Sequence, residues 1–228
     1  MRYSIILRHF HSPKARLFKD GLEALGYKAS EPRNADVLVI WNRYGGDVYH
    51  AQEAEARGAK VLIAENATWG NEFAGKRWYS LWPTLHNRAS SIRPGGPDRW
   101  DSLGVTLEPW RNGPEVIGLP QRGIGPRAIA MPSGWTPPGC TRIRKHPGKG
   151  PCKPLEEDLA QAGRVVTWGS GAAVKALAWG IPVDSHMPDW CAEQDNTDSG
   201  RLAMFQRLAW AQFTHAEIAS GEAFRCVL

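Results

Sequence analysis

The chain has 228 residues, of which 42% are hydrophobic and 22% charged, a composition that predicts a globular protein with a sizeable core and excludes a disordered or collagen-like chain. No apolar run approaches the roughly 20 residues of a membrane-spanning helix, and the N-terminal segment lacks a signal-peptide cleavage site. Four cysteines without C-x-x-C spacing indicate free thiols and a cytoplasmic protein. The net charge of +5 favours anionic ligands but does not establish a nucleic-acid partner.

The first third of the chain alternates apolar runs with amphipathic segments. The pattern predicts strands and helices in the order strand 4–8, helix 12–26, strand 36–41, helix 47–58 and strand 60–65. The runs are continuous in the way of strands buried on both faces. Strands that alternate with helices form parallel sheets through right-handed crossovers, so we expect a parallel sheet here.

Residues 66–114 break this rhythm with a long stretch rich in Gly, Pro, Arg and Trp. Such a length is unusual for a connection within a compact domain and indicates a functional segment. Two interpretations are open. The segment either covers the sheet, or it forms an acceptor surface on which basic side chains hold a phosphate and tryptophans stack an extruded base.

The alternating pattern returns after residue 114. Strands and helices are predicted in the order strand 115–120, strand 141–147, helix 154–163, strand 164–168, helix 169–180 and strand 181–185. The tail is helical, with Leu202 and Phe205 on its apolar face, and Thr214 and Glu217 form a capping box for a last helix. We therefore expect an α/β protein with two Rossmann-like halves, 1–114 and 115–228, whose parallel sheets flank a ligand cleft.

The clearest chemical signal is the turn Gly169-Ser170-Gly171, which follows the strand that ends near Thr167. Glycines let the backbone approach a ligand, and a serine N-cap places a helix N-terminus at the same point, which suits a phosphate. His146 could add a hydrogen-bond donor from a neighbouring strand. The alternative is an ordinary tight turn beside a surface histidine.

Two sequence segments resemble the nucleotide-sugar-binding half of glycosyltransferases with two Rossmann domains, the GT-B fold. These are IRKHP and LEEDLAQAGRVVTWGSGAAVKALAWGIPV, and they are most similar to the capsular-polysaccharide, Kdo-transferase-like group. The resemblance implies a UDP- or CMP-linked sugar donor, no required metal, and a donor site with these residues: Gln121, Arg144, His146, Thr167, Gly169, Ser170 and Gly171.

A second resemblance covers roughly residues 36–228. The segments LIAENATWGNEF, LHNRAS, LEPW and RLAWAQFTHAEIASGEAF resemble glycosyltransferase-like bacteriophage proteins, some associated with DNA-base modification. This resemblance implies transfer to a hydroxymethylated pyrimidine in double-stranded DNA, in the host cytoplasm. The alternatives are a capsule or lipopolysaccharide acceptor, and a non-catalytic module that binds a nucleotide or DNA.

Glycosyl transfer often needs a base that deprotonates the acceptor hydroxyl. Three residues at predicted strand ends qualify, in the order Glu65, Asp47 and His9. Each also has a structural explanation, respectively as a loop anchor, a helix cap and a polar residue at a sheet edge. Cys140 and Cys152 flank His146 but lack a paired metal-ligand spacing, so no metal site is predicted.

Overall fold

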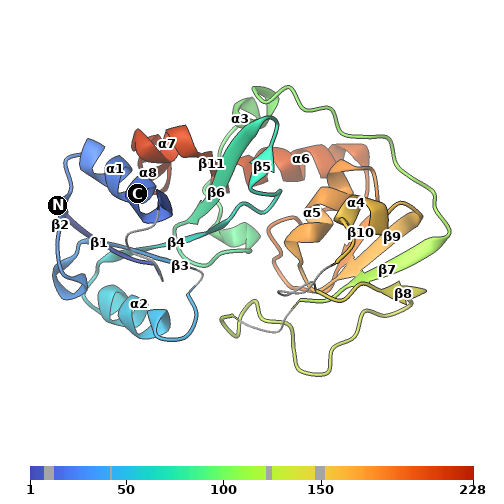
Figure 1. Ribbon diagram of the computed structural model, residues 1–228, viewed down its shortest axis with the longest axis horizontal. Coiled ribbons are helices and arrows are strands. Elements are labelled where there is room, and N and C mark those ends of the chain that lie inside the picture. Colours follow the sequence, from blue (N-terminus) through green and yellow to red (C-terminus); the bar gives the residue numbers. More distant parts are fainter. Residues whose placement is uncertain (8–12, 42, 122–124, 147–151) are drawn as a thin grey trace.

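A computed structural model describes residues 1–7, 13–41, 43–121, 125–146 and 152–228. It contains two sheets that lie side by side, with helices packed around them (Figure 1). Within the described part of the chain, the first sheet has seven strands in the order β11-β6-β4-β3-β1-β2, with β5 paired to β6. The second has four strands in the order β10-β9-β7-β8.

The first sheet begins as the parallel unit that the sequence predicts. Strands β1 to β4 run parallel, with α1 and α2 as crossovers; the elements are β1 (Arg2–Ile6), α1 (Pro13–Ala24), β2 (Lys28–Ala29), η1 (Pro32–Asn34), β3 (Val37–Trp41), α2 (Asp47–Ala56) and β4 (Lys60–Asn66). Helices cover both faces of this sheet, with α2 opposite α1 (Figure 1). That explains the continuous apolar runs in its central strands.

The segment 66–114 is more ordered than its composition indicates. It contains β5 (Glu72–Phe73), β6 (Lys76–Trp82), η2 (Ala89–Ser91) and α3 (Asp98–Asp101). Strand β6 pairs antiparallel with β4, so the first sheet is mixed and not purely parallel. The sequence pattern does not predict these strands and short helices within the loop-rich segment.

The second sheet is parallel, as predicted. Its elements are β7 (Glu115–Leu119), β8 (Arg142–Ile143), α4 (Leu155–Asp158), β9 (Ala162–Thr167), α5 (Gly171–Ala178) and β10 (Val183–Ser185). The strand expected at 141–147 is reduced to β8, and the helix expected at 154–163 to α4. Strand β7 lies between β8 and β9, so the His146 segment and the Gly169 turn follow strands that are not neighbours.

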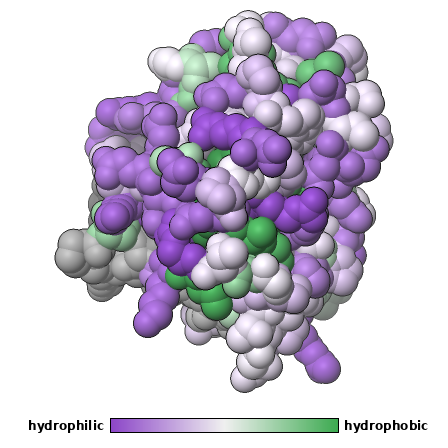
Figure 2. All heavy atoms as spheres, turned by 90° about the vertical axis from the view of Figure 1, so that its right-hand side faces the viewer, coloured by the Kyte–Doolittle hydropathy of each residue, from purple (hydrophilic) through white to green (hydrophobic). Residues whose placement is uncertain are grey.

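Figure 2 shows the face of the molecule on the side of the second sheet. This face is mainly hydrophilic, with a hydrophobic area near its centre. On the edge strand β8, Ile143 is 48% exposed.

The C-terminal segment returns to the first sheet. It consists of α6 (Asp198–Leu208), η3 (Ala209–Ala211), β11 (Gln212–Thr214), α7 (His215–Ala219) and α8 (Glu222–Val227). Strand β11 pairs with β6, and α7 packs on α1 so closely that a Cβ at Gly21 would lie 1.8 Å from the Ile218 carbonyl oxygen. The predicted capping box of Thr214 and Glu217 is confirmed. The division of the chain into two halves at residue 114 stays a prediction. The C-terminal segment crosses from the second half back to the first, so the chain passes between the halves twice.

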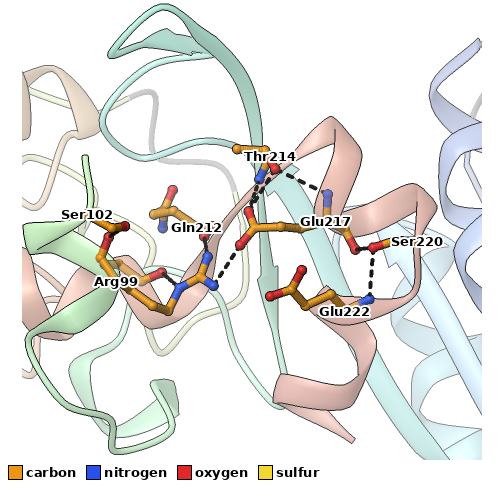
Figure 3. A network of polar contacts seen from close by, with 8 residues as sticks. Arg99, Ser102, Gln212, Thr214, Glu217, Ser220 and Glu222 are labelled. Atoms are coloured by element: carbon orange, nitrogen blue, oxygen red, sulfur yellow. Dashed lines mark hydrogen bonds and ion pairs between the residues drawn. The ribbon is translucent and has the colours of Figure 1, made fainter. Parts of the chain in front are cut away.

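Arg99 ties the returning segment to the rest of the fold (Figure 3). Its guanidinium pairs with Glu217 at 2.7 Å and donates hydrogen bonds to the carbonyl oxygens of Ala209 and Gln212. The Gln212 side chain is buried, and its Oε1 accepts a hydrogen bond from the Thr68 backbone N–H at 2.8 Å. A chain of polar contacts thus runs from α3 through β11 to the loop after β4.

Two apolar clusters form the core. One lies between the first sheet and α1, α7 and α8, and includes Phe18 and Phe224. The other contains side chains of both sheets, such as Ile63 of β4 and Val165 of β9. The molecule is therefore an α/β protein with two Rossmann-like halves joined through the cluster that both sheets share, which confirms the predicted fold class.

Candidate functional site

A cleft of about 750 Å³ opens between the two halves. The ends of β4 and β6 line it from the first half, and the segments after β7 and β8 together with the start of α5 line it from the second. Seven of the ten predicted site residues line this one cavity: Glu65, Gln121, Arg144, His146, Gly169, Ser170 and Gly171. Their convergence follows from the parallel sheets, whose carboxyl ends face a shared crevice.

The other three predicted residues are placed differently. Thr167 is buried beneath the Gly169 turn, outside the cleft lining. Asp47 does not line the cleft, and it is the first residue of α2 and not its cap, because the N-cap is Gly46. His9 lies outside the described residues.

The Gly169 turn is held from below by Thr167. Its Oγ1 donates to the Leu119 carbonyl oxygen at 2.8 Å and accepts hydrogen bonds from the N–H groups of Gly169 (3.2 Å) and Ser170 (2.9 Å). Ser170 then caps α5 by accepting from the Ala172 N–H at 3.3 Å. Three backbone N–H groups are therefore already bonded within the turn, so fewer of them face a ligand than the sequence indicates.

Gly169 is required on two grounds. Its φ of 113° lies in the region that favours glycine, and a Cβ there would lie 2.8 Å from Met187 Sδ and 3.1 Å from Trp190 Cδ1. The Gly169 carbonyl oxygen accepts hydrogen bonds from Gln121 Nε2 (2.8 Å) and Asn87 Nδ2 (3.0 Å). The turn is thus fixed from both halves of the molecule.

Two predicted donor-site residues, Arg144 and His146, lie on the second-half wall. Arg144 Nε lies 2.6 Å from Asp158 Oδ2, and Arg144 Nη2 donates to the Lys153 carbonyl oxygen. This guanidinium is therefore already committed to partners within the fold. His146 is exposed at the cleft, three residues beyond the end of β8.

The first-half wall follows from the register of β4 and β6. Glu65 is paired with Ser80, and Ile63 with Trp82. Directly opposed residues share a face of a sheet, as do residues two apart on a strand, so the Glu65, Ser80 and Trp82 side chains point to the same side. Glu65 Oε1 accepts a hydrogen bond from the Asn66 N–H at 2.8 Å. A carboxylate thus lies on the wall opposite the turn.

Trp82, His86 and Asn87 are among the cleft residues that the sequence analysis does not select. They follow or end β6, inside the segment that reads as loop. Burial lowers the pKa of His86 to about 4, so its imidazole is neutral near pH 7. Asn87 contacts Gly169, which lies 82 positions further along the chain, so local spacing in the sequence does not predict this contact.

The structure of the basic and aromatic segment 66–114 favours the interpretation that this segment covers the sheet. Trp69, Trp78 and Trp100 are buried in the core and cannot stack an incoming base. Arg88 and Arg99 are engaged in ion pairs with Asp189 and Glu217. The features that suggested a nucleic-acid surface therefore serve packing.

The part of the chain that the structure describes contains no group of three or more His, Cys, Asp or Glu side chains arranged to hold a metal ion. No helix among these residues is long and apolar enough to cross a membrane.

Comparison with known proteins places the fold. Two Rossmann-like halves around a cleft form the GT-B-like fold class that the sequence analysis predicts. A solved structure with this arrangement is KpsC of Thermosulfurimonas dismutans, described as a beta Kdo 2,7 transferase, with a TM-score of 0.50 and 11% sequence identity over 98% of this chain and 99% of that chain. At 11% sequence identity, this structural similarity establishes the fold alone. At the level of the fold, it confirms the resemblance to the Kdo-transferase-like group.

The sequence comparisons add no relative. No protein-family model matches the chain, and no curated protein is significantly similar to it in sequence. Nothing in the comparisons supports the expected relation to bacteriophage DNA-modification proteins.

Proposed function

We propose that this protein is a glycosyltransferase that moves a sugar from a nucleotide-linked donor to a hydroxyl of a carbohydrate acceptor. The observation that carries the proposal is the shared cleft, in which the Ser170 turn and His146 of one half face Glu65 of the other. The GT-B-like fold, seen also in a Kdo transferase, supports it.

The donor phosphate would bind at the start of α5. The exposed His146 and the positive end of the helix are suited to stabilise the negative charge that develops on the leaving nucleotide. Gln121 and Asn87 would act as positioning residues, because both hold the Gly169 carbonyl oxygen. Thr167 would act in the same way from below the turn. No step of this arrangement uses a metal ion.

Glu65 is the residue proposed to deprotonate the acceptor hydroxyl. It lies on the first-half wall of the cleft, across from the turn. Asp47 is not proposed again for this role, since it does not line the cleft. A carbohydrate acceptor is preferred to DNA, because Trp69, Trp78 and Trp100 are buried and Arg88 and Arg99 are engaged in ion pairs.

The direct test is an incubation of the purified protein with UDP- and CMP-linked sugars and a panel of capsule and lipopolysaccharide oligosaccharides, with hydroxymethylated DNA as a parallel acceptor. Mass spectrometry should show addition of one sugar to an oligosaccharide. Addition to DNA alone would replace the acceptor assignment. No addition to any acceptor would leave a binding module and contradict the proposal.

The donor site has its own test. Ser170→Ala combined with His146→Ala should weaken nucleotide binding measured by calorimetry, because the double variant loses a helix cap and an anion partner. Arg111→Ala is a matched control, since this arginine pairs with Glu108 and does not line the cleft. Equal affinity in the wild type and the double variant would remove the phosphate assignment.

A further inference from the structure

His86 is a cleft residue that the proposed donor phosphate site and acceptor base leave unused. It lies on the first-half wall, four residues beyond the end of β6. Its chain neighbour Asn87 donates a hydrogen bond to the Gly169 carbonyl oxygen at 3.0 Å. His86, Asn87 and the Gly169 turn all line the same cleft.

The two ring nitrogens of His86 differ. Nδ1 is shielded from solvent and has no hydrogen-bond partner among the described residues. His86 itself lines the cleft, so this unpartnered nitrogen belongs to a cleft side chain. A neutral imidazole has one donor and one acceptor nitrogen, and a buried polar atom without a partner costs about 1–3 kcal/mol. The imidazole therefore brings unused hydrogen-bonding capacity to the cleft.

The indole of Trp82 is a second unpartnered group of the cleft, but it is weaker evidence for a ligand than the imidazole. It lines the cleft, is buried, and its Nε1 also lacks a partner among the described residues. However, the indole nitrogens of Trp69 and Trp190 lack partners too, and neither lines this cleft. An unpartnered indole is thus not diagnostic here, and the inference depends on the imidazole.

We propose that His86 binds the sugar of the nucleotide-linked donor by a hydrogen bond between its imidazole and a sugar hydroxyl. The inference rests on the proposed function and adds which wall holds the transferred sugar. In this arrangement the phosphate binds at the Ser170 turn and the sugar occupies the part of the same cleft that Asn87 and His86 line. A hydroxyl is both donor and acceptor, so it matches a neutral imidazole in either tautomer.

The test compares nucleotides with nucleotide sugars. Calorimetry would measure the affinities of UDP against UDP-glucose and of CMP against CMP-N-acetylneuraminate, so that a neutral and an acidic sugar are both sampled. In the wild type, the sugar should tighten binding in at least one pair. His86→Phe should reduce that gain by about two- to tenfold, the value of one hydrogen bond, and leave the affinity for the free nucleotide unchanged.

Two further variants sharpen the reading. His86→Gln retains a donor and an acceptor and should restore part of the gain. His50→Phe makes the same substitution on α2, away from the cleft lining, and should change neither affinity. If His86→Phe does not fold, as judged by circular dichroism, His86→Ala replaces it in the same measurement.

The outcomes separate this inference from the proposed function. An unchanged ratio of nucleotide-sugar to nucleotide affinity in the His86 variant overturns the inference and leaves the function standing. Equal loss for nucleotide and nucleotide sugar overturns it as well, because His86 would then act on the nucleotide. Failure of the wild type to bind any nucleotide overturns both.

Discussion

At the scale of single residues, the buried imidazole of His86 should govern part of the pH dependence of stability. Its folded pKa of about 4 lies below the ordinary value of 6.5. Between these values the unfolded chain binds a proton that the folded protein excludes, so stability falls as the pH drops from about 6.5 to about 4, by up to about 3 kcal/mol.

This pH effect can be isolated with His86→Phe. Urea unfolding at pH 7, 5 and 4 should show a smaller loss of stability in the variant than in the wild type. At pH 7 the variant should be at least as stable, because an unpartnered buried nitrogen has been removed. Parallel pH curves for the two proteins would contradict the environment described for this side chain.

Gly169→Ala should both destabilise the protein and impair donor binding. The new Cβ meets Met187 and Trp190 and requires a φ of 113°, so a loss of about 2–5 kcal/mol is expected. Gly134→Ala is the control, since Gly134 has a φ of 79° and nothing within 4 Å of the added carbon, and should lose only about 1 kcal/mol. Similar losses at both sites in denaturant unfolding would contradict the packing argument.

Residue by residue, the sequence predicts the part of the site that depends on local backbone chemistry. Gly169 to Gly171 form a turn and a helix start, and glycine and a serine N-cap are visible as such in sequence. His86 and Asn87 are different, because they acquire their role only through contacts across the cleft. An isolated histidine within an irregular segment carries no pattern that fixes such a contact.

At the scale of secondary structure, the junction between β9 and α5 depends on one hydroxyl. Thr167→Val keeps the shape of the side chain but leaves the N–H groups of Gly169 and Ser170 without their acceptor. We expect a loss of about 2–4 kcal/mol and weaker nucleotide binding.

The control for Thr167 is Thr141→Val. Thr141 Oγ1 also bonds the backbone, at the N–H and carbonyl oxygen of Val116, but in an exposed position where water can substitute. Its loss should be about 1 kcal/mol or less and should not alter nucleotide binding. If thermal unfolding shows equal losses for the two variants, the buried hydroxyl is not what holds the turn.

The elements that the sequence misses are those set by tertiary pairing. Strand β6 (KRWYSLW) is antiparallel and lies among glycines and prolines, so the βαβ rhythm gives no reason to expect it. Strand β11 has three residues and follows a helix, and its existence depends on pairing with β6. The helical face assigned to Leu202 is also wrong, because Leu202 is 39% exposed while Phe205 is buried.

At the scale of the whole molecule, the two halves should unfold together. One apolar cluster contains side chains from both sheets, and the chain crosses from the second half back to the first at β11. Separate unfolding of either half would expose that shared cluster. Scanning calorimetry should therefore show one transition, with equal calorimetric and van't Hoff enthalpies.

Arg99 offers the sharpest test of this coupling. Its side chain is 13% exposed and that of its partner Glu217 is 19% exposed, so Arg99→Met should leave a carboxylate poorly solvated and cost about 2 kcal/mol or more. Arg77→Met removes a pair with Glu72 whose side chains are mostly exposed and should cost less than about 1 kcal/mol. Because β11 connects both halves, Arg99→Met should lower the midpoint of the whole transition without splitting it. Two resolved transitions in the wild type would show that the sheets are independent, and a transition split only by Arg99→Met would show that the C-terminal return, and not the shared core, makes them one unit.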